Sequence, residues 1–152
     1  ILVKTLNLTK GGFGMENTEY KLSGFEVLAV IFAFADVAEF PADKRFIQNF
    51  IREMEKRPEF KGLLPFVLSD NVDIYPFSRS LDEAMTLLQM GGVIIIIMKQ
   101  PAIFRISQEL RKKYIIKAGE TLNSEEITKI RNLAYKFARA AEEAMMNFAR
   151  DI

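Results

Sequence analysis

Apolar residues recur along much of the chain at the three- and four-residue spacing of an amphipathic helix. This spacing predicts one helix at 25–40, which opens with a capping box made by Ser23 and Glu26. We expect Pro41 to end this helix and to start a second one, whose apolar side chains at 42–57 fall on one face. The first helix is therefore predicted to be buried and the second to lie at the surface.

Turn-forming residues interrupt the middle of the chain before the helical spacing returns. Residues 63–71 fit either a short strand or a helical turn. A loop is predicted after them, marked by Asp70, Asn71, Asp73 and Pro76. The helical spacing returns at 80–90, where Ser78 or Ser80 can cap the first turn, and the double glycine at 91–92 is expected to end the helix.

Two short apolar segments, at 93–98 and 103–106, follow the double glycine. Four residues separate them, so they predict a β-hairpin with a short loop. The first segment is apolar at six consecutive positions, which suits a strand that is buried on both faces. We therefore expect either the C-terminal helix or a second subunit to cover it.

The last third of the chain is again helical in its pattern. A short helix is predicted at 108–114 and a break at Ala118-Gly119. A much longer helix starts at Asn123 or Ser124 and continues to the end of the chain. It is longer than a small domain needs, so it either folds back over the core or pairs with a second copy. The residues expected at such a homodimer contact are Ile127, Ile130, Phe137 and Phe148.

These elements predict a mainly α fold with a small β-hairpin, in a chain of 152 residues that has room for one core. We assign 15–118 to the domain and 119–152 to the C-terminal helix. Residues 1–14 are predicted to be a translated leader, because Lys10-Gly11-Gly12 can be encoded by a purine-rich ribosome-binding sequence shortly before Met15. A short native extension or a cloning remnant fits these residues equally, and the nucleotide sequence decides between these origins.

The chain contains no cysteine and no histidine. This excludes thiol nucleophiles, disulfides, histidine-based triads and zinc sites built from Cys and His. Paired carboxylates occur only where helix surfaces normally carry charge, without a phosphate loop or metal-binding motif beside them. The pairs are Glu53 with Glu55, Asp82 with Glu83, and Glu142 with Glu143. We therefore expect no enzymatic activity, metal or cofactor, and the low glutamine content further favours a thermophilic origin.

Charge is distributed unevenly along the chain, although the net charge is only +1. Residues 99–117 contain six basic residues and one acidic residue, whereas the first 43 residues carry a net charge of −3. The basic segment is either a nucleic-acid contact or a solvated surface. The apolar segment 25–40 contains three acidic residues and is shorter than the roughly 20 residues that cross a bilayer. We expect a cytoplasmic protein without a membrane contact.

Two motifs resemble those of known families. Leu88, followed by Gly92 and an apolar strand, is similar to the end of the recognition helix and the start of the wing in winged-helix proteins. Tyr75-Pro76-Phe77-Ser78, followed by Leu81 and Leu88, resembles a motif of Panacea-type antitoxin domains and related phage-associated proteins. The glycine that these domains have between tyrosine and proline is missing here. Neither resemblance supplies a catalytic residue.

The winged-helix resemblance implies contact with duplex DNA, with one helix in the major groove and the wing on the backbone or in the minor groove. The helix that would enter the groove is acidic at Asp82 and Glu83. The polar side chains that it offers to bases belong to Ser78, Arg79, Ser80, Thr86 and Gln89. The basic residues predicted to contact nucleic acid are Arg79, Lys99, Arg105, Arg111, Lys112, Lys113 and Lys117.

Two functions follow from these observations. The first is a nucleic-acid-binding protein that regulates transcription, dimeric if the last helix pairs with a second copy. The second is an antitoxin-like interaction module, which binds a protein partner through the apolar helix at 25–40 or through the wing strands. In this second interpretation the basic segment keeps the protein soluble or contacts an acidic partner.

Overall fold

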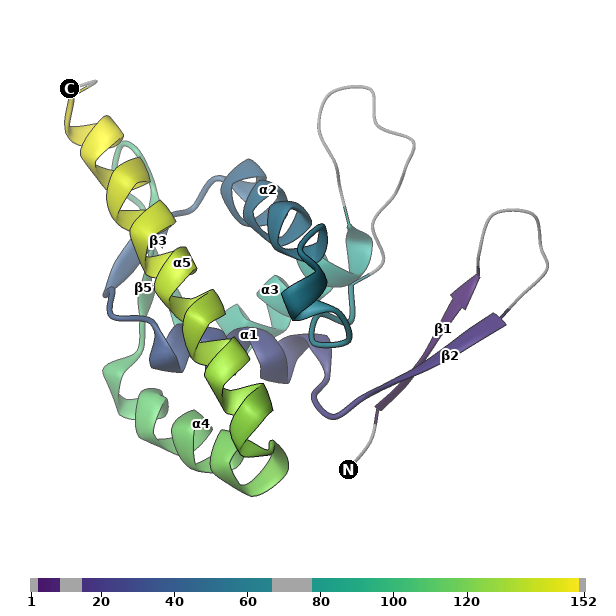
Figure 1. Ribbon diagram of the computed structural model, residues 1–152. Coiled ribbons are helices and arrows are strands. Elements are labelled where there is room, and N and C mark those ends of the chain that lie inside the picture. The colour runs from purple at the N-terminus through teal and green to yellow at the C-terminus, as the bar shows by residue number, and fades with distance from the viewer. Residues whose placement is uncertain (1–2, 9–14, 67–77, 151–152) are drawn as a thin grey trace.

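The computed structural model describes residues 3–8, 15–66 and 78–150 (Figure 1). Within them the chain is mainly helical, with a small three-stranded antiparallel sheet and a separate two-stranded hairpin. Among the described helices, none has both the length and the apolar character that a membrane span requires. The elements are β1 (Val3–Leu8), β2 (Met15–Tyr20), α1 (Gly24–Phe34), β3 (Glu39–Pro41), α2 (Lys44–Glu55), the 3-10 helix η1 (Pro58–Phe60), α3 (Arg79–Met90), β4 (Ile94–Ile97), β5 (Ile103–Ile106), α4 (Gln108–Thr121) and α5 (Ser124–Arg150).

The first helix is shorter than the sequence predicts. It ends at Phe34, and Ala35 is extended, so the predicted helix up to residue 40 is wrong in its last turns. Phe40 instead belongs to β3, which pairs with β5 and brings its ring against Phe104. Alternate residues of this segment, among them Ala38 and Ala42, form the backbone hydrogen bonds to the neighbouring strand segment. The nitrogen of Pro41, which has no hydrogen to donate, therefore points away from β5. A three-residue strand is too short to produce a readable periodicity, which is why the pattern missed it.

The predicted hairpin at 93–98 and 103–106 is confirmed as β4 and β5. Ile94 pairs with Ile106, and Ile96 with Phe104. The turn between the strands contains a cis peptide bond between Gln100 and Pro101. β5 is the central strand, with β3 on one side and β4 on the other, so β4 forms an edge of the sheet.

Helix α4 does not break at Ala118-Gly119 as the sequence predicts. It continues to Thr121 because α4 packs along α1 and Ala118 is fully buried, while Gly119 is exposed. This burial outweighs the low helix propensity of one glycine, which costs about 1 kcal/mol relative to alanine. α4 is therefore a full partner of α1 rather than a short connecting helix.

Helix α5 folds back across the core and packs on α1, α2 and β3 (Figure 1). Asn123 caps its start, since its Oδ1 accepts a hydrogen bond from the Glu126 N–H at 2.8 Å. Two residues of the expected homodimer contact, Ile130 and Phe137, are fully buried in the core of their own chain. Their side chains are therefore not available to a second subunit, and this part of the expected contact is wrong.

Phenylalanine rings meet where α1, α2, β3 and α5 converge. The ring centroid of Phe137 lies 5.1 Å from that of Phe32 and 5.1 Å from that of Phe40. Phe50 and Phe46 lie 5.4 Å and 6.0 Å from it. These separations are in the range in which aromatic pairs attract each other. The cluster joins three helices to the sheet.

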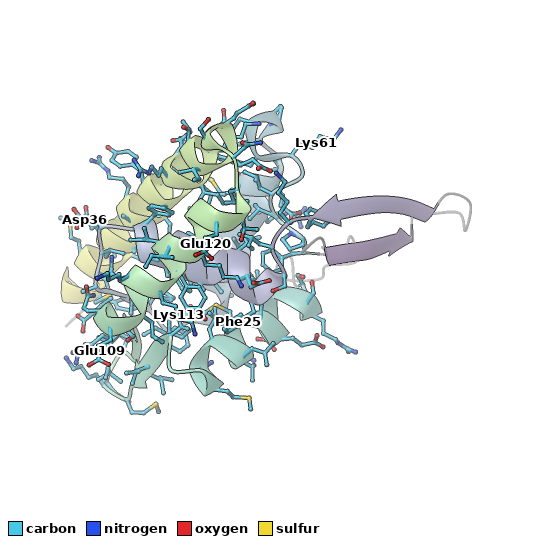
Figure 2. All side chains as sticks on the ribbon, turned by 90° about the horizontal axis from the view of Figure 1, so that it is seen from below. Phe25, Asp36, Lys61, Glu109, Lys113 and Glu120 are labelled. Carbon is cyan, nitrogen blue, oxygen red and sulfur yellow. The ribbon has the colours of Figure 1, made fainter. Side chains whose placement is uncertain are left out.

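The strands β1 and β2 form a hairpin that extends away from the helices (Figures 1 and 2). Their register pairs Val3 with Tyr20 and Leu8 with Met15. Part of the predicted leader is thus paired with the residues that follow Met15. The predicted loop at Asp70, Asn71, Asp73 and Pro76 lies outside the described residues.

Replacing the ring at the centre of the aromatic cluster should destabilise the fold. We expect Phe137→Ala to lower the free energy of unfolding by about 3–5 kcal/mol, because it leaves a cavity among four other rings. Urea denaturation followed by circular dichroism measures this change. Tyr135→Ala, which truncates an exposed ring on the same helix, should cost less than about 1 kcal/mol; equal losses for the two variants would contradict the central role of the cluster.

Candidate interaction surface

Helix α3 is fixed at both ends. The Ser78 Oγ accepts a hydrogen bond from the Leu81 N–H at 3.2 Å, so Ser78, one of two predicted candidates, is the N-cap. Gln48 of α2 binds the same residue twice: its Oε1 accepts from the Ser78 N–H at 2.7 Å and its Nε2 donates to the Ser78 carbonyl at 3.0 Å. At the other end, Gly92 has a φ of 74° and turns the chain into the sheet. The double glycine thus ends the helix as predicted.

The surface from the second half of α3 through β4 carries no charge and exposes several large apolar side chains. From residue 84 to residue 98 the chain has no charged side chain, although 27% of the sequence is charged. We call the exposed apolar side chains of this segment the neutral face: Leu87 (51% exposed), Met90 (79%), Ile95 (51%), Ile96 (42%) and Met98 (80%). The helix for which the sequence predicts DNA reading therefore exposes two large apolar side chains, Leu87 and Met90, in its uncharged second half. The uncharged run was the signal in the sequence that could have revealed this face.

A groove with a volume of about 330 Å³ lies between α2, α3 and the sheet, beside the neutral face. Met85, Ile96 and Phe104 contribute apolar walls. Lys44 and Asp82, whose Nζ and Oδ1 atoms are 3.3 Å apart, also line it. The other lining residues are Ala42, Ile47, Gln48, Thr86 and Gln89. Apolar walls with a few polar groups are typical of binding sites, and the sequence did not predict this groove.

Three of the predicted nucleic-acid contacts are engaged within the protein. Arg105 and Glu39, which are neighbours in the sheet, form a salt bridge with an Nη2–Oε2 distance of 2.8 Å. Lys117 pairs with Glu26 at 2.7 Å. The Arg111 guanidinium donates hydrogen bonds to the carbonyls of Ala35 and Val37, in the connection between α1 and β3. These side chains stabilise the fold, so the sequence overestimated the basic surface.

The other predicted contacts, Arg79, Lys99, Lys112 and Lys113, are exposed. No ion pair joins any of them to another residue in the described part of the chain. They lie on three separate parts of the fold: Arg79 at the start of α3, Lys99 in the hairpin turn, and Lys112 and Lys113 in α4. Figure 2 shows Lys113 on α4, where Glu109 lies one turn earlier. The exposed basic residues are thus distributed over α3, the hairpin turn and α4.

Two carboxylates each cap a helix and bind a lysine. Glu26 accepts a hydrogen bond from the Ser23 N–H at 3.2 Å and pairs with Lys117. Glu126 accepts from the backbone of its own N-cap and pairs with Lys21 at 2.6 Å. Burial raises the pKa of Glu26, but hydrogen bonds from Lys117 and Ser23 outweigh this effect and leave the pKa below its usual value. Lys117 therefore stabilises the start of α1 through its ion pair with Glu26.

The described residues contain no group of three or more acidic side chains arranged to hold a metal ion. No family model, curated protein or solved structure matches the chain. The winged-helix and antitoxin-like resemblances therefore stay predictions. What the geometry offers is a preformed groove beside an uncharged apolar surface.

Arg111 should act on stability rather than on binding. We expect Arg111→Ala to lower the free energy of unfolding by about 2–3 kcal/mol, because two backbone carbonyls lose charged hydrogen-bond donors. Lys112→Ala, which removes the exposed neighbouring charge, should change it by less than about 0.5 kcal/mol. Chemical denaturation measures both variants. A stable Arg111→Ala protein would restore Arg111 as a candidate ligand contact.

Glu55 is a half-buried carboxyl at the end of α2. Burial raises its pKa from the usual 4.5 to about 7, and its Oε1 has no hydrogen-bond partner among the described residues. The folded protein therefore keeps a proton that the unfolded chain has already released between these two pH values. The contribution of Glu55 to stability falls as the pH rises through this interval and stays low above it.

Glu55→Gln should accordingly raise the melting temperature most at high pH. We expect a clear increase over the wild type at about pH 8 and little difference at about pH 4, where the carboxyl is protonated in both states. Differential scanning calorimetry across this pH range measures the effect. Glu53→Gln removes an exposed carboxylate on the same helix together with its ion pair to Lys56, so it should not raise the melting temperature at high pH. A pH-independent difference between Glu55→Gln and wild type would contradict the raised pKa.

Proposed function

We propose that the protein is a non-enzymatic interaction module with a winged-helix-like arrangement, and that it binds a protein partner through the groove between α2, α3 and the sheet. The order of its elements supports the arrangement: α1, α2 and a capped α3 precede the hairpin of β4 and β5, and β3 adds a third strand to that hairpin. The groove lies where α3 meets the hairpin. The function rests on the uncharged stretch from residue 84 to residue 98, whose exposed apolar side chains lie beside this groove.

The chemistry of the groove favours a protein over DNA. DNA contact depends mainly on cationic side chains that meet phosphates. Here the groove contains one cation, Lys44, and one anion, Asp82, so the net charge of its lining residues is zero. A phosphate backbone gains little from such a pair, whereas a peptide can use one donor and one acceptor for its own backbone groups. Apolar walls at Met85, Ile96 and Phe104 suit a hydrophobic anchor side chain from the partner.

Rigidity supports the same proposal. Gln48 fixes the start of α3 to α2, and the Gly92 turn fixes its end to the sheet, so the walls of the groove are held in place before a partner arrives. A preformed site avoids the entropy cost of ordering itself during binding. The resemblance to antitoxin-like domains also implies binding to a protein partner.

Site-specific photo-crosslinking tests this function. A photoreactive residue in place of Gln89, at the groove, should give one discrete protein adduct in cells, while the same residue in place of Asn132, exposed on α5, should give none. The partner is then purified and its binding measured by calorimetry.

Two threonines offer a matched pair of variants for this test. Thr86 lines the groove and Thr128 lies on α5; each donates its hydroxyl to the carbonyl four residues earlier, at 3.1 Å and 2.9 Å. We expect Thr86→Arg to weaken partner binding at least about tenfold by filling the groove. Thr128→Arg adds the same charge elsewhere and should leave binding unchanged. Equal effects of the two variants would contradict binding in the groove.

Binding of generic duplex DNA at low salt measures the other function that the sequence predicts. The proposal expects no salt-dependent binding by fluorescence anisotropy. Salt-dependent binding that is lost on combining Lys112→Glu with Lys113→Glu, and kept in Thr86→Arg, would replace the proposed function with nucleic-acid binding.

A further inference from the structure

β4 has a free backbone edge. The Ser107 N–H donates to the Val93 carbonyl at 2.8 Å, and these two residues continue the register of β4 with β5. In an antiparallel ladder such bonded pairs alternate, so Ile95 also bonds to β5, while the N–H and C=O groups of Ile94 and Ile96 point to the opposite side. No strand pairs with β4 on that side within the described residues.

This edge lacks the features that normally protect an exposed strand. Charged side chains, prolines and bulges usually prevent edge strands from pairing with another chain. β4 consists of four isoleucines, and the nearest charged residue after it is Lys99. Ile95 is 51% exposed and Ile96 42%, so both faces of the strand as well as its edge reach the surface. The strand is thus open to pairing.

The C-terminal helix does not cover β4. The sequence required a cover for the apolar run at 93–98, either from that helix or from a second subunit. α5 packs on β3, at the far edge of the sheet from β4. The second subunit is the remaining candidate.

We propose that a second copy of this chain pairs with β4 edge to edge, antiparallel and about a two-fold axis, to form a continuous six-stranded sheet. The axis passes beside Ile95, which faces the partner's Ile95, while Ile94 and Ile96 exchange backbone hydrogen bonds with the partner's Ile96 and Ile94. In this register Met98, which is 80% exposed, falls opposite the partner's Gly92, where no side chain obstructs it. The proposal goes beyond the proposed function and does not depend on it.

The absence of charge on this edge allows it to contact a second copy of itself. A two-fold contact places each surface against itself, so like charges would oppose each other if the surface carried any. The stretch from 84 to 98 carries none. The nearest lysine, Lys99, lies about 26 Å along the strand from its counterpart in the partner, at eight residues of about 3.3 Å each. This exceeds the screening length of about 8 Å at physiological salt.

The contact also continues the inner face of the sheet from one copy into the other. The inner face of the sheet carries Ile96 next to the groove, and a continuous sheet keeps this face on one side in both copies. The two grooves would therefore open on the same side of the dimer. A partner with two binding segments could then engage both grooves.

The test introduces a positive charge at the two-fold axis in one variant and a negative charge in another. The wild-type protein should form a dimer in sedimentation equilibrium between about 1 µM and about 1 mM. In a dimer of either Ile95→Lys or Ile95→Glu, two like charges would face each other across the axis, where facing Cβ atoms are about 5 Å apart. Each variant should therefore raise the dissociation constant of the dimer by about 100-fold or more. An equimolar mixture of the two variants should dimerise again, which a misfolded protein could not do.

Two further variants complete the experiment. Ile96→Pro removes an N–H on the free edge and no bond to β5, and should give a folded monomer. Tyr135→Lys, which places the same charge at an exposed ring on α5, should remain a dimer. A wild-type monomer throughout the concentration range would overturn the proposal. A dimer that survives Ile95→Lys and Ile96→Pro, or a mixture that stays monomeric, would overturn it as well, whatever the crosslinking of the groove shows.

Discussion

The packing of Phe137 against Phe32 and Phe40 is the contact on which the rest of the structure depends. These rings come from the last helix, the first helix and the short strand β3. Their contact closes the core between segments that are far apart in the sequence. Phe40 also packs on Phe104 of β5, so the position of the sheet follows from the same cluster. A helical bundle and a small sheet thereby become one core.

The position of this core decides which surface is left open. The aromatic cluster uses β3 and β5, while β4, at the far edge, buries only Ile94 fully. Gln48 holds α3 beside this strand, and the Gly92 turn is too short to let the two separate. The groove and the neutral face therefore lie together where the core ends. The exposed side chains of the neutral face lie outside the core, so they cost the fold little, whereas the groove shares Met85 and Phe104 with the core.

The basic residues show how tertiary structure changes the meaning of a charge pattern. In the sequence they form one dense segment, but Arg105 lies beside Glu39 only because β3 pairs with β5. Arg111 reaches the carbonyls after α1 only because α4 packs along that helix. Charge density along the chain therefore overestimates the charge presented to a ligand, since partners from distant segments cannot be seen in it.

The sequence by itself determined the features that rest on local physics. Ser23 caps α1 as predicted, and Ser78 and Asn123, each one of two predicted candidates, cap α3 and α5. The double glycine ends α3, and the two apolar runs form the hairpin. Tertiary structure alone decided that residues 39–41 form a strand, that α4 continues through Gly119, and that α5 covers β3 instead of β4. It also created the groove, which joins three distant segments. The physical reason is that caps, turns and periodicity act over a few residues, whereas burial and pairing depend on partners that only the folded chain brings together.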